Sequence, residues 1–353
     1  MKFKGQHILS TKQFDKNSLL AFFGRMKKME KVVVDGVVGG KQSKLCEGKI
    51  LATLFYEPST RTRFSFETAM LRLGGRVISN FDMLKTSSVA KMESLRDTGK
   101  VVSQMVDVIA MRHPEVGSVE ELAKGSDVPV INAGDGIGEH PTQALLDLYT
   151  IWKNKGDVSG LTVGMIGDLK NGRVPHSQCS LLKHFGCKFI FVSPVALKMP
   201  RDVVAELKAC GCEIIEVEEL AEVVGKMDVI CMTRIQKERF SSEKEYERYA
   251  GRYILDGKMM KLAKKNAIVL HPLPRVDEIS SDVDDDVRAK YFEQVKNGVA
   301  VRMALICEVL GIVGGRDFKK NEKSFIQKWA GGFRKRSFFC RCFGGRREDK
   351  RSC

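Results

Sequence analysis

The chain of 353 residues is long enough for two domains, and its 43% hydrophobic content excludes disorder over most of its length. Its net charge of +15 is uneven, because residues 314–353 carry 13 Lys and Arg against 4 Asp and Glu. A basic tail of net charge +9 therefore follows a body of net charge +6.

The first residues carry charges but no apolar signal-peptide core, and no stretch reaches the ~18 consecutive apolar residues of a membrane-spanning helix. The ten cysteines show neither paired zinc-site spacing nor a compact disulfide framework. We therefore expect a cytoplasmic protein. Five of the cysteines are expected to be small core residues: Cys46, Cys179, Cys187, Cys231 and Cys307.

The first predicted element is a helix over 13–34, where apolar residues recur at helical spacing and a glycine-rich turn follows. Strand-like apolar runs then alternate with helix-patterned segments. These runs cover 49–56, 106–111, 129–132, 161–166, 189–192, 229–232 and 267–270. Such alternation predicts an α/β fold of mainly parallel sheets flanked by helices.

A polar, glycine-bearing segment over 152–160 follows a helical run over 142–151 and is the predicted junction of two α/β domains linked by helices. The predicted boundaries are a first domain over 1–148, completed by a C-terminal helix within 290–313, a second domain over 149–289, and an extension over 314–353.

The most informative segment covers 55–67 (FYEPSTRTRFSFE), where a strand leads through hydroxyl residues into a helix. A helix N-terminus presents unpaired N–H groups and a partial positive charge. Ser59, Thr60 and Thr62 add hydroxyl donors there, and Arg61 adds a guanidinium. The segment predicts a phosphate pocket, and the ordinary alternative is a Ser/Thr helix cap with solvated arginines.

Two further polar clusters, at 111–114 (MRHP) and 134–143 (GDGIGEHPTQ), also follow apolar runs. Ligands of open α/β sheets bind beyond the carboxyl ends of the strands. We therefore expect Arg112, His140 and Gln143 to converge on one crevice. Taken singly, a histidine such as His140 is more often a hydrogen-bonding residue at a helix start than a catalytic residue.

The second half holds three more candidates. The turn over 164–176 lacks the G-x-G-x-x-G order, so nicotinamide binding is weakly supported, and Arg173 stands at a predicted helix start. Glu238 follows Arg234 at the spacing of one helical turn and could brace its guanidinium, although a solvated charge run is the alternative. The two prolines of 271–277 (HPLPRVD) predict a rigid loop whose free carbonyls suit an amine donor.

Together these motifs resemble those of the aspartate/ornithine carbamoyltransferase superfamily, and specifically the aspartate carbamoyltransferase catalytic chain. The resemblance covers about residues 7–313. It is carried by 59–63 (STRTR), 87–91 (SSVAK) leading into Glu93, 111–114, 140–148 (HPTQALLDL), 167–176, 233–239 (TRIQKER) and 271–278 (HPLPRVDE). The ornithine enzymes have a motif that resembles H-C-L-P-R where this chain has HPLPR at 271–275. They also carry an amine-recognition motif that is absent here.

The resemblance implies transfer of the carbamoyl group of carbamoyl phosphate to the amine of L-aspartate. The products would be N-carbamoyl-L-aspartate and phosphate, in the second step of de novo pyrimidine (UMP) synthesis, with no cofactor and no metal. Both substrates are polyanions, so a site rich in arginine and poor in carboxylate is physically appropriate. Attack by the neutral amine places negative charge on the carbonyl oxygen, where preorganised donors act most strongly.

The family pattern also implies roles for individual residues. Carbamoyl phosphate would be bound by Ser59, Thr60, Arg61, Thr62, Ser87, Lys91, Arg112, His140, Gln143, Pro272 and Leu273. Aspartate would be bound by Lys91, Arg173, Arg234, Gln236 and Leu273, with Glu238 fixing Arg234. Catalytic roles are implied for Arg61, Thr62, Lys91, Arg112 and His140. Within this set Thr62, Arg112 and His140 surround the carbamoyl oxygen, and Gln143 with the backbone of Pro272 and Leu273 takes the NH₂ group.

In the family, residues such as Ser87 and Lys91 reach the active site of the neighbouring subunit, which implies a homotrimer with shared sites. Whether regulatory subunits bind is left open by the sequence. The chain departs from the family pattern at Met92, in place of glycine, and at Val174 and Pro175, in place of threonine and valine. Val174 offers no hydroxyl, and Pro175 is tolerable in a first helical turn.

The third departure is the tail over 314–353, which extends past the usual end of the family. Its ordinary interpretation is a solvated extension. Its aromatic residues and the cysteines of 338–343 (FFCRCF) support a second hypothesis, contact with an anionic membrane surface or a partner. Nucleic acid is not expected, because no fold motif for it is present. The functional alternatives are a carbamoyltransferase for another amino acid and a scaffold that acts through this tail.

Overall fold

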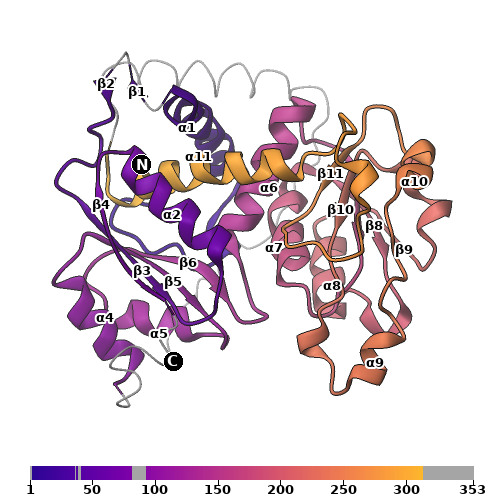
Figure 1. The fold of residues 1–353 in the computed structure, drawn as a ribbon, viewed down its shortest axis with the longest axis horizontal. Helices are drawn as coiled ribbons and strands as arrows, with labels where there is room; N and C mark the ends of the chain where they lie inside the picture. The colour runs from indigo at the N-terminus through magenta and orange to yellow at the C-terminus, as the bar shows by residue number, and fades with distance from the viewer. Residues whose placement is uncertain (1, 36, 39–40, 82–92, 313–353) are drawn as a thin grey trace, which may run out of the picture.

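The computed structural model describes residues 2–35, 37–38, 41–81 and 93–312. Two parallel β-sheets lie on opposite sides of the molecule that these residues form (Figure 1). The first sheet has the order β4-β3-β5-β6. Its strands are β3 (Ile50–Phe55), β4 (Arg76–Phe81), β5 (Val108–His113) and β6 (Val130–Asp135). Both faces are covered by helices: α1 (Lys16–Asp35), α2 (Thr60–Arg72), α4 (Leu95–Ser103) and α5 (Ser118–Gly125).

Alternate side chains of β3 separate two parts of the core. Leu51 and Phe55 pack with the large cluster that includes α1 and α2, whereas Ala52 and Leu54 pack with residues of α4 and α5 or their neighbours. This period of two is the geometry of a strand that is buried on both faces.

The second sheet has the order β11-β10-β7-β8-β9 and is also parallel. Its strands are β7 (Thr162–Ile166), β8 (Lys188–Val192), β9 (Ile214–Val217), β10 (Val229–Met232) and β11 (Ile268–Leu270). The helices of this half are α7 (Arg173–Leu182), α8 (Arg201–Ala209), α9 (Glu243–Glu247) and α10 (Gly257–Leu262).

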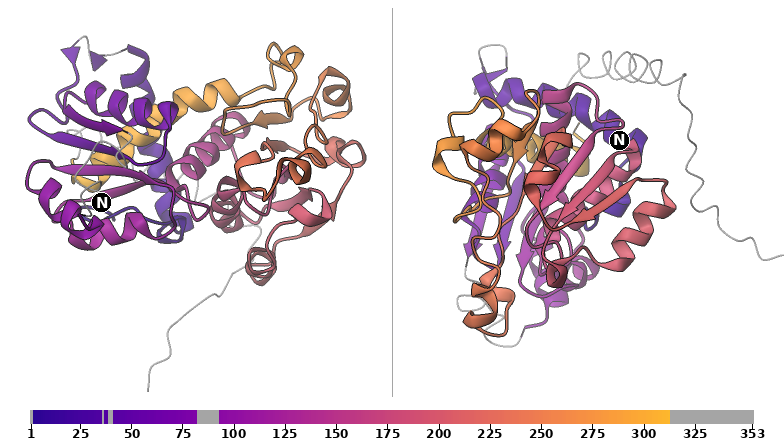
Figure 2. Two further views of the ribbon diagram at one scale, coloured as in Figure 1. Left: turned by 60° about the horizontal axis from the view of Figure 1, so that its bottom comes forward. Right: turned by 90° about the vertical axis from the view of Figure 1, so that its right-hand side faces the viewer.

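Two buried helices join the halves. Helix α6 (Pro141–Lys155) packs on β6, α7 and α11, and every residue from Pro141 to Trp152 is buried. Helix α11 (Tyr291–Val309) runs from the second sheet back to the first, where it packs on α1 and α2 (Figures 1 and 2). No helix of the described residues is long and apolar enough to cross a membrane.

The predicted fold class is confirmed, and each predicted strand lies within a few residues of an observed one. Four strands of the described residues were not predicted: β4, β9 and the short antiparallel pair β1 (Val37–Val38) and β2 (Lys41–Gln42). Strands β4 and β9 lie at sheet edges, so they carry polar or exposed residues instead of an apolar run. The five cysteines predicted to be core residues are buried and free.

The opening helix begins later than the sequence pattern suggests. Residues Thr11–Gln13 form a 3₁₀ turn capped by Ser10, and α1 begins at Lys16. At the predicted junction over 152–160, α6 continues to Lys155 and ends at Gly156, whose φ is 75°. The predicted boundary at 148 therefore falls inside α6, and the tail over 314–353 lies outside the described residues.

Candidate active site

A pocket of about 460 Å³ lies between the two halves of the molecule. It is lined by residues that follow β3, β10 and β11, by Arg112 near the end of β5, by the first residues of α2, α6 and α7, and by residues of α11. The carboxyl ends of strands from both sheets thus meet at one pocket, as expected for ligand binding in α/β folds.

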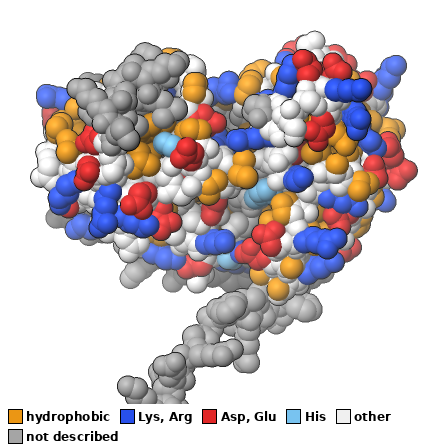
Figure 3. Space-filling view, turned by 90° about the horizontal axis from the view of Figure 1, so that it is seen from below, with side chains coloured by type: hydrophobic (Ala, Val, Ile, Leu, Met, Phe, Trp, Pro, Cys, Tyr) orange, Lys and Arg blue, Asp and Glu red, His pale blue; other side chains and the backbone are white. Residues whose placement is uncertain are grey.

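Charge distinguishes this pocket from the outer surface. Among the described residues that line it are six arginines and a single carboxylate, Glu57. On the outer face seen in Figure 3, by contrast, basic and acidic side chains are interspersed. The described residues contain no cluster of His, Cys, Asp or Glu suited to a metal ion. The pocket therefore matches an anionic ligand with several oxygen atoms.

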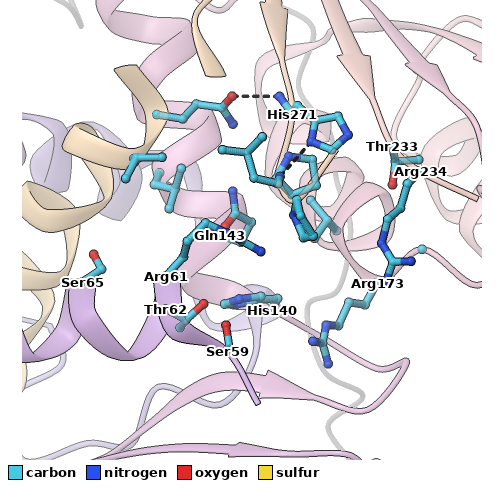
Figure 4. A pocket seen from close by; sticks show the side chains of 18 of the residues that line it. Ser59, Arg61, Thr62, Ser65, His140, Gln143, Arg173, Thr233, Arg234 and His271 are labelled. Atoms are coloured by element: carbon cyan, nitrogen blue, oxygen red, sulfur yellow. Dashed lines mark hydrogen bonds between the residues drawn. The ribbon is translucent and has the colours of Figure 1, made fainter. Parts of the chain in front are cut away.

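The first turn of α2 forms one end of the pocket. Ser59 is its N-cap, but its side chain makes no capping hydrogen bond, so the hydroxyl is available to a ligand. Thr62 is buried and Arg61 lines the pocket, where burial and then the charge of Arg234 lower the pKa of Arg61. Figure 4 shows Ser59, Thr62 and His140 close together beside this turn. Hydroxyls, backbone N–H groups and a guanidinium thus converge, as a phosphate group requires.

Two arginines share the one carboxylate of the pocket. Arg112 Nη2 lies 2.7 Å from Glu57 Oε2, and Arg173 Nη2 lies 3.2 Å from the same oxygen. Burial, and then the charge of Arg173, lower the pKa of Arg112 to about 10. Gly134 permits this approach, because a Cβ there would lie 3.1 Å from Arg112 Nη1 and 3.3 Å from Arg173 Cζ. Glu57 lies within the predicted phosphate segment, but no role was predicted for it.

His140 combines the two roles that the sequence left open. It is the N-cap of α6, and its backbone N–H donates to Ser177 Oγ (3.1 Å). Its ring lines the pocket, and Nδ1 has no hydrogen-bond partner among the described residues. Burial, followed by the charges of Arg173, Arg112 and Arg302, holds the pKa of His140 well below 6.5. The ring is therefore neutral near pH 7 and can donate or accept one hydrogen bond to a ligand.

The second half contributes Arg173, Arg234 and Gln236, which all line the pocket. In Figure 4, Arg173 and Arg234 lie on the opposite side from Ser59 and Thr62. The side chain of Glu238, the predicted brace of Arg234, lies outside the described residues, as do Ser87, Lys91 and Met92.

The start of α7 accommodates its unusual proline. Gly172 is the N-cap, Pro175 is the third helical residue, and the first i→i−4 bond runs from His176 N to Gly172 O (3.5 Å). The N–H that proline lacks therefore has no partner to lose in the helix.

The loop after β11 is held by side chains. His271 Nε2 lies 2.7 Å from Glu278 Oε1, and His271 Nδ1 accepts a hydrogen bond from the backbone N–H of Leu273 (2.8 Å). Leu273 has a left-handed φ of 53°, and its peptide bond to Pro274 is cis. These bonds fix Pro272 and Leu273 at the pocket wall.

Sequence reasoning missed several residues of the pocket wall. Besides Glu57 they include Ser65, Arg239, His271, Gln294 and Arg302. Arg302 is buried on α11 and donates to Ser65 Oγ (2.9 Å) and Thr142 Oγ1 (3.2 Å). Its signal was a single arginine within the otherwise apolar stretch 298–307 (GVAVRMALIC), a position that is costly without polar partners.

Two family models match the chain in sequence. Residues 6–153 match the carbamoyl-P binding domain of aspartate/ornithine carbamoyltransferases, and residues 159–309 match their Asp/Orn binding domain. The chain belongs to the aspartate/ornithine carbamoyltransferase family.

Individual relatives are similar over most of the chain. An aspartate carbamoyltransferase catalytic subunit of Clostridium novyi is 55% identical over 77% of this chain and 89% of its own. The catalytic subunit of M. jannaschii aspartate transcarbamoylase is 47% identical, with a TM-score of 0.80 over 88% of this chain and 98% of that one. The Trypanosoma cruzi aspartate transcarbamoylase in complex with carbamoyl phosphate and aspartate is 41% identical, with a TM-score of 0.81 over 87% and 98%.

Proposed function

We propose that this chain is an aspartate carbamoyltransferase, which transfers the carbamoyl group of carbamoyl phosphate to L-aspartate in pyrimidine biosynthesis. The observation that carries the proposal is the pocket itself, where six arginines oppose one carboxylate among the described residues. Carbamoyl phosphate and aspartate together bring a phosphate and two carboxylates, which need several cationic donors. The relatives named above support the same reaction.

In the proposed complex the phosphate lies at the start of α2, bound by Ser59, Thr60, Arg61 and Thr62. The carbamoyl oxygen meets Thr62, Arg112 and the neutral ring of His140. As the neutral aspartate amine attacks the carbonyl carbon, the new C–N bond forms, the bond from that carbon to the phosphate oxygen breaks, and phosphate leaves with the proton that the amine gives up. Negative charge on the carbamoyl oxygen during this step is stabilised by donors that are already in place.

The remaining polar groups have roles at the other reacting atoms. Gln143 and the backbone carbonyls of Pro272 and Leu273 accept hydrogen bonds from the carbamoyl NH₂. Arg173 binds one aspartate carboxylate, and Arg234 with Gln236 binds the other. Glu57 pairs with Arg112 and Arg173 in the ligand-free pocket, so substrate anions would compete with it for these guanidinium groups.

We further propose the assembly and the domain division that the sequence predicts. Residues 1–148, completed by the helix within 290–313, would bind carbamoyl phosphate, and residues 149–289 would bind aspartate. Ser87 and Lys91 would enter the site of a neighbouring subunit in a cytoplasmic homotrimer. The matches to carbamoyl-P and Asp/Orn binding domains support the assignment of the two halves.

The test is formation of carbamoyl aspartate by the purified chain, with L-ornithine as the competing acceptor. We expect product with aspartate and none with ornithine. Arg234→Ala should raise the KM for aspartate while direct binding of carbamoyl phosphate survives, because its partner is an aspartate carboxylate. Arg252→Ala is the matched control, since Arg252 pairs with Glu218 outside the pocket. Equal impairment of both variants, or a preference for ornithine, would overturn the proposal.

A further inference from the structure

Asp147 on α6 is a fully buried carboxylate that does not line the pocket itself. It is hydrogen-bonded to two side chains that do line the pocket, Gln143 and Gln294. Three glutamine side chains donate to it through Nε2. Gln143 (2.8 Å) and Gln294 (2.6 Å) donate to Oδ1, and Gln178 (2.7 Å) donates to Oδ2. These glutamines come from α6, α11 and α7, so a single carboxylate connects three helices.

The first consequence concerns the orientation of Gln143. Burial raises the pKa of Asp147 to about 6, so near pH 7 its carboxylate is ionised and can only accept hydrogen bonds. The amide of Gln143 must therefore turn its NH₂ toward Asp147, which leaves Oε1 as the acceptor for a ligand. In Figure 4, Gln143 lies between the start of α2 and His271.

The second consequence concerns the loop after β11. Because Gln294 gives its Nε2 to Asp147, its Oε1 faces the loop and accepts the backbone N–H of His271 (2.9 Å). The N–H of Leu273 is already bound to His271 Nδ1, and Pro272 and Pro274 have no N–H. Residues 271–274 therefore have no free backbone donor, and their carbonyl oxygens are what remains for a ligand.

We propose that Asp147 is a positioning residue that makes this end of the pocket acceptor-only and thereby selects an acyl phosphate bearing an NH₂ group. The inference rests on the proposed function and deepens it. A ligand with a methyl group in place of NH₂ would leave Gln143 Oε1 and the loop carbonyls without donors, which costs binding free energy. Among the described residues, the titratable groups that interact with Asp147 are Arg302 on α11 and Cys231 on β10. The charge of Arg302 offsets part of the cost of burying the Asp147 carboxylate.

The test compares the affinity of the full-length chain for carbamoyl phosphate and for acetyl phosphate, which differ only in NH₂ and CH₃. Both are measured by calorimetric titration without aspartate, so their shared phosphate contacts cancel in the ratio. We expect the wild type to prefer carbamoyl phosphate. In Asp147→Leu, which removes both acceptors at similar volume, the preference should fall about five- to tenfold. Asp147→Asn keeps one acceptor oxygen, so its preference for carbamoyl phosphate should lie between those of the wild type and Asp147→Leu.

Two further variants keep the test decisive. Thr150→Val is the matched control, because Thr150 is buried one turn along α6 and accepts a hydrogen bond from Asn297 of α11 (2.9 Å) without reaching the pocket. It should keep the wild-type preference. If Asp147→Leu does not fold, Gln294→Met interrupts the same network from α11 and should also lower the preference.

A folded Asp147→Leu or Gln294→Met variant with the wild-type preference would overturn the inference, as would an equal loss in Thr150→Val. Failure of the proposed function looks different. In that case the wild type itself would not bind carbamoyl phosphate or form carbamoyl aspartate.

Discussion

Arg112 and His140 are the side chains whose removal should slow the reaction most while the fold persists. Both line the pocket and are proposed to meet charge that develops on the carbamoyl oxygen only during attack. Loss of one such donor typically lowers the rate by ~10²–10³. We expect falls of this size in kcat for Arg112→Ala and His140→Ala under saturating substrates. Lys100→Ala, on the exposed surface, is the control, and near-normal kcat in both pocket variants would remove them from the mechanism.

Asp147 should make folding stability depend on pH. Burial raises its pKa from 3.8 to about 6, so the folded state holds this proton more tightly than the unfolded state does. The resulting stabilisation is complete below pH 3.8 and is lost as pH rises through 6. Denaturant titrations should therefore show that Asp147→Asn becomes more stable relative to the wild type between pH 4 and pH 7, by up to about 3 kcal/mol. A constant difference across this range would contradict the assignment.

At the scale of elements, the end of β7 depends on Gly167. Its φ is 119°, and a Cβ there would lie 2.1 Å from the carbonyl oxygen of Thr233, just beyond β10. Gly167→Ala should lower the free energy of unfolding by about 2–5 kcal/mol, because backbone strain adds to a clash with backbone. Gly186→Ala is the control, since Gly186 also has positive φ (62°) but has nothing within 4 Å. That variant should lose only about 1–2 kcal/mol in denaturant unfolding, and equal losses would show that the close approach is unimportant.

At the scale of the whole molecule, the proposed shared site predicts complementation. Lys91→Ala and Arg61→Ala would each inactivate the chain. At any one site, however, Lys91 and Arg61 would come from different subunits. When the two inactive proteins are dissociated, mixed and reassembled, some sites should lack both defects and activity should return. Mixed trimers that are verified by mass and remain inactive would show that Lys91 serves its own subunit.

The basic tail carries a separate prediction. Every proposed site residue precedes residue 315, so deletion of 315–353 should leave turnover unchanged. If the tail contacts anionic lipid, the full chain should sediment with phosphatidylserine vesicles at low salt, because Lys and Arg near such a surface contribute about 1 kcal/mol each. The truncated chain should not sediment. Equal vesicle binding by both chains would leave the solvated extension as the correct interpretation.

The sequence alone determined the fold class and most of the pocket. Parallel strands buried on both faces appear as apolar runs, and polar residues that follow such runs must lie at one edge of a sheet. This is why Arg112, His140 and Gln143 could be assigned to one crevice before their distances were known, whereas Arg61, Arg173 and Arg234 were assigned to the same site by the resemblance to the family. The edge strands β4 and β9 were not predicted from the sequence because they lack that apolar signal.

Only the tertiary structure decided which polar groups share a partner. Glu57 meets Arg173 from 116 residues away, and Asp147 meets Gln294 from 147 residues away. In the sequence Asp147 is one polar residue within an amphipathic helix, where a carboxylate ordinarily faces solvent. It is buried because α7 and α11 close over α6, and once buried it must be paired. Local patterns fix the type of an element, whereas burial and pairing depend on contacts between segments that are distant in the chain.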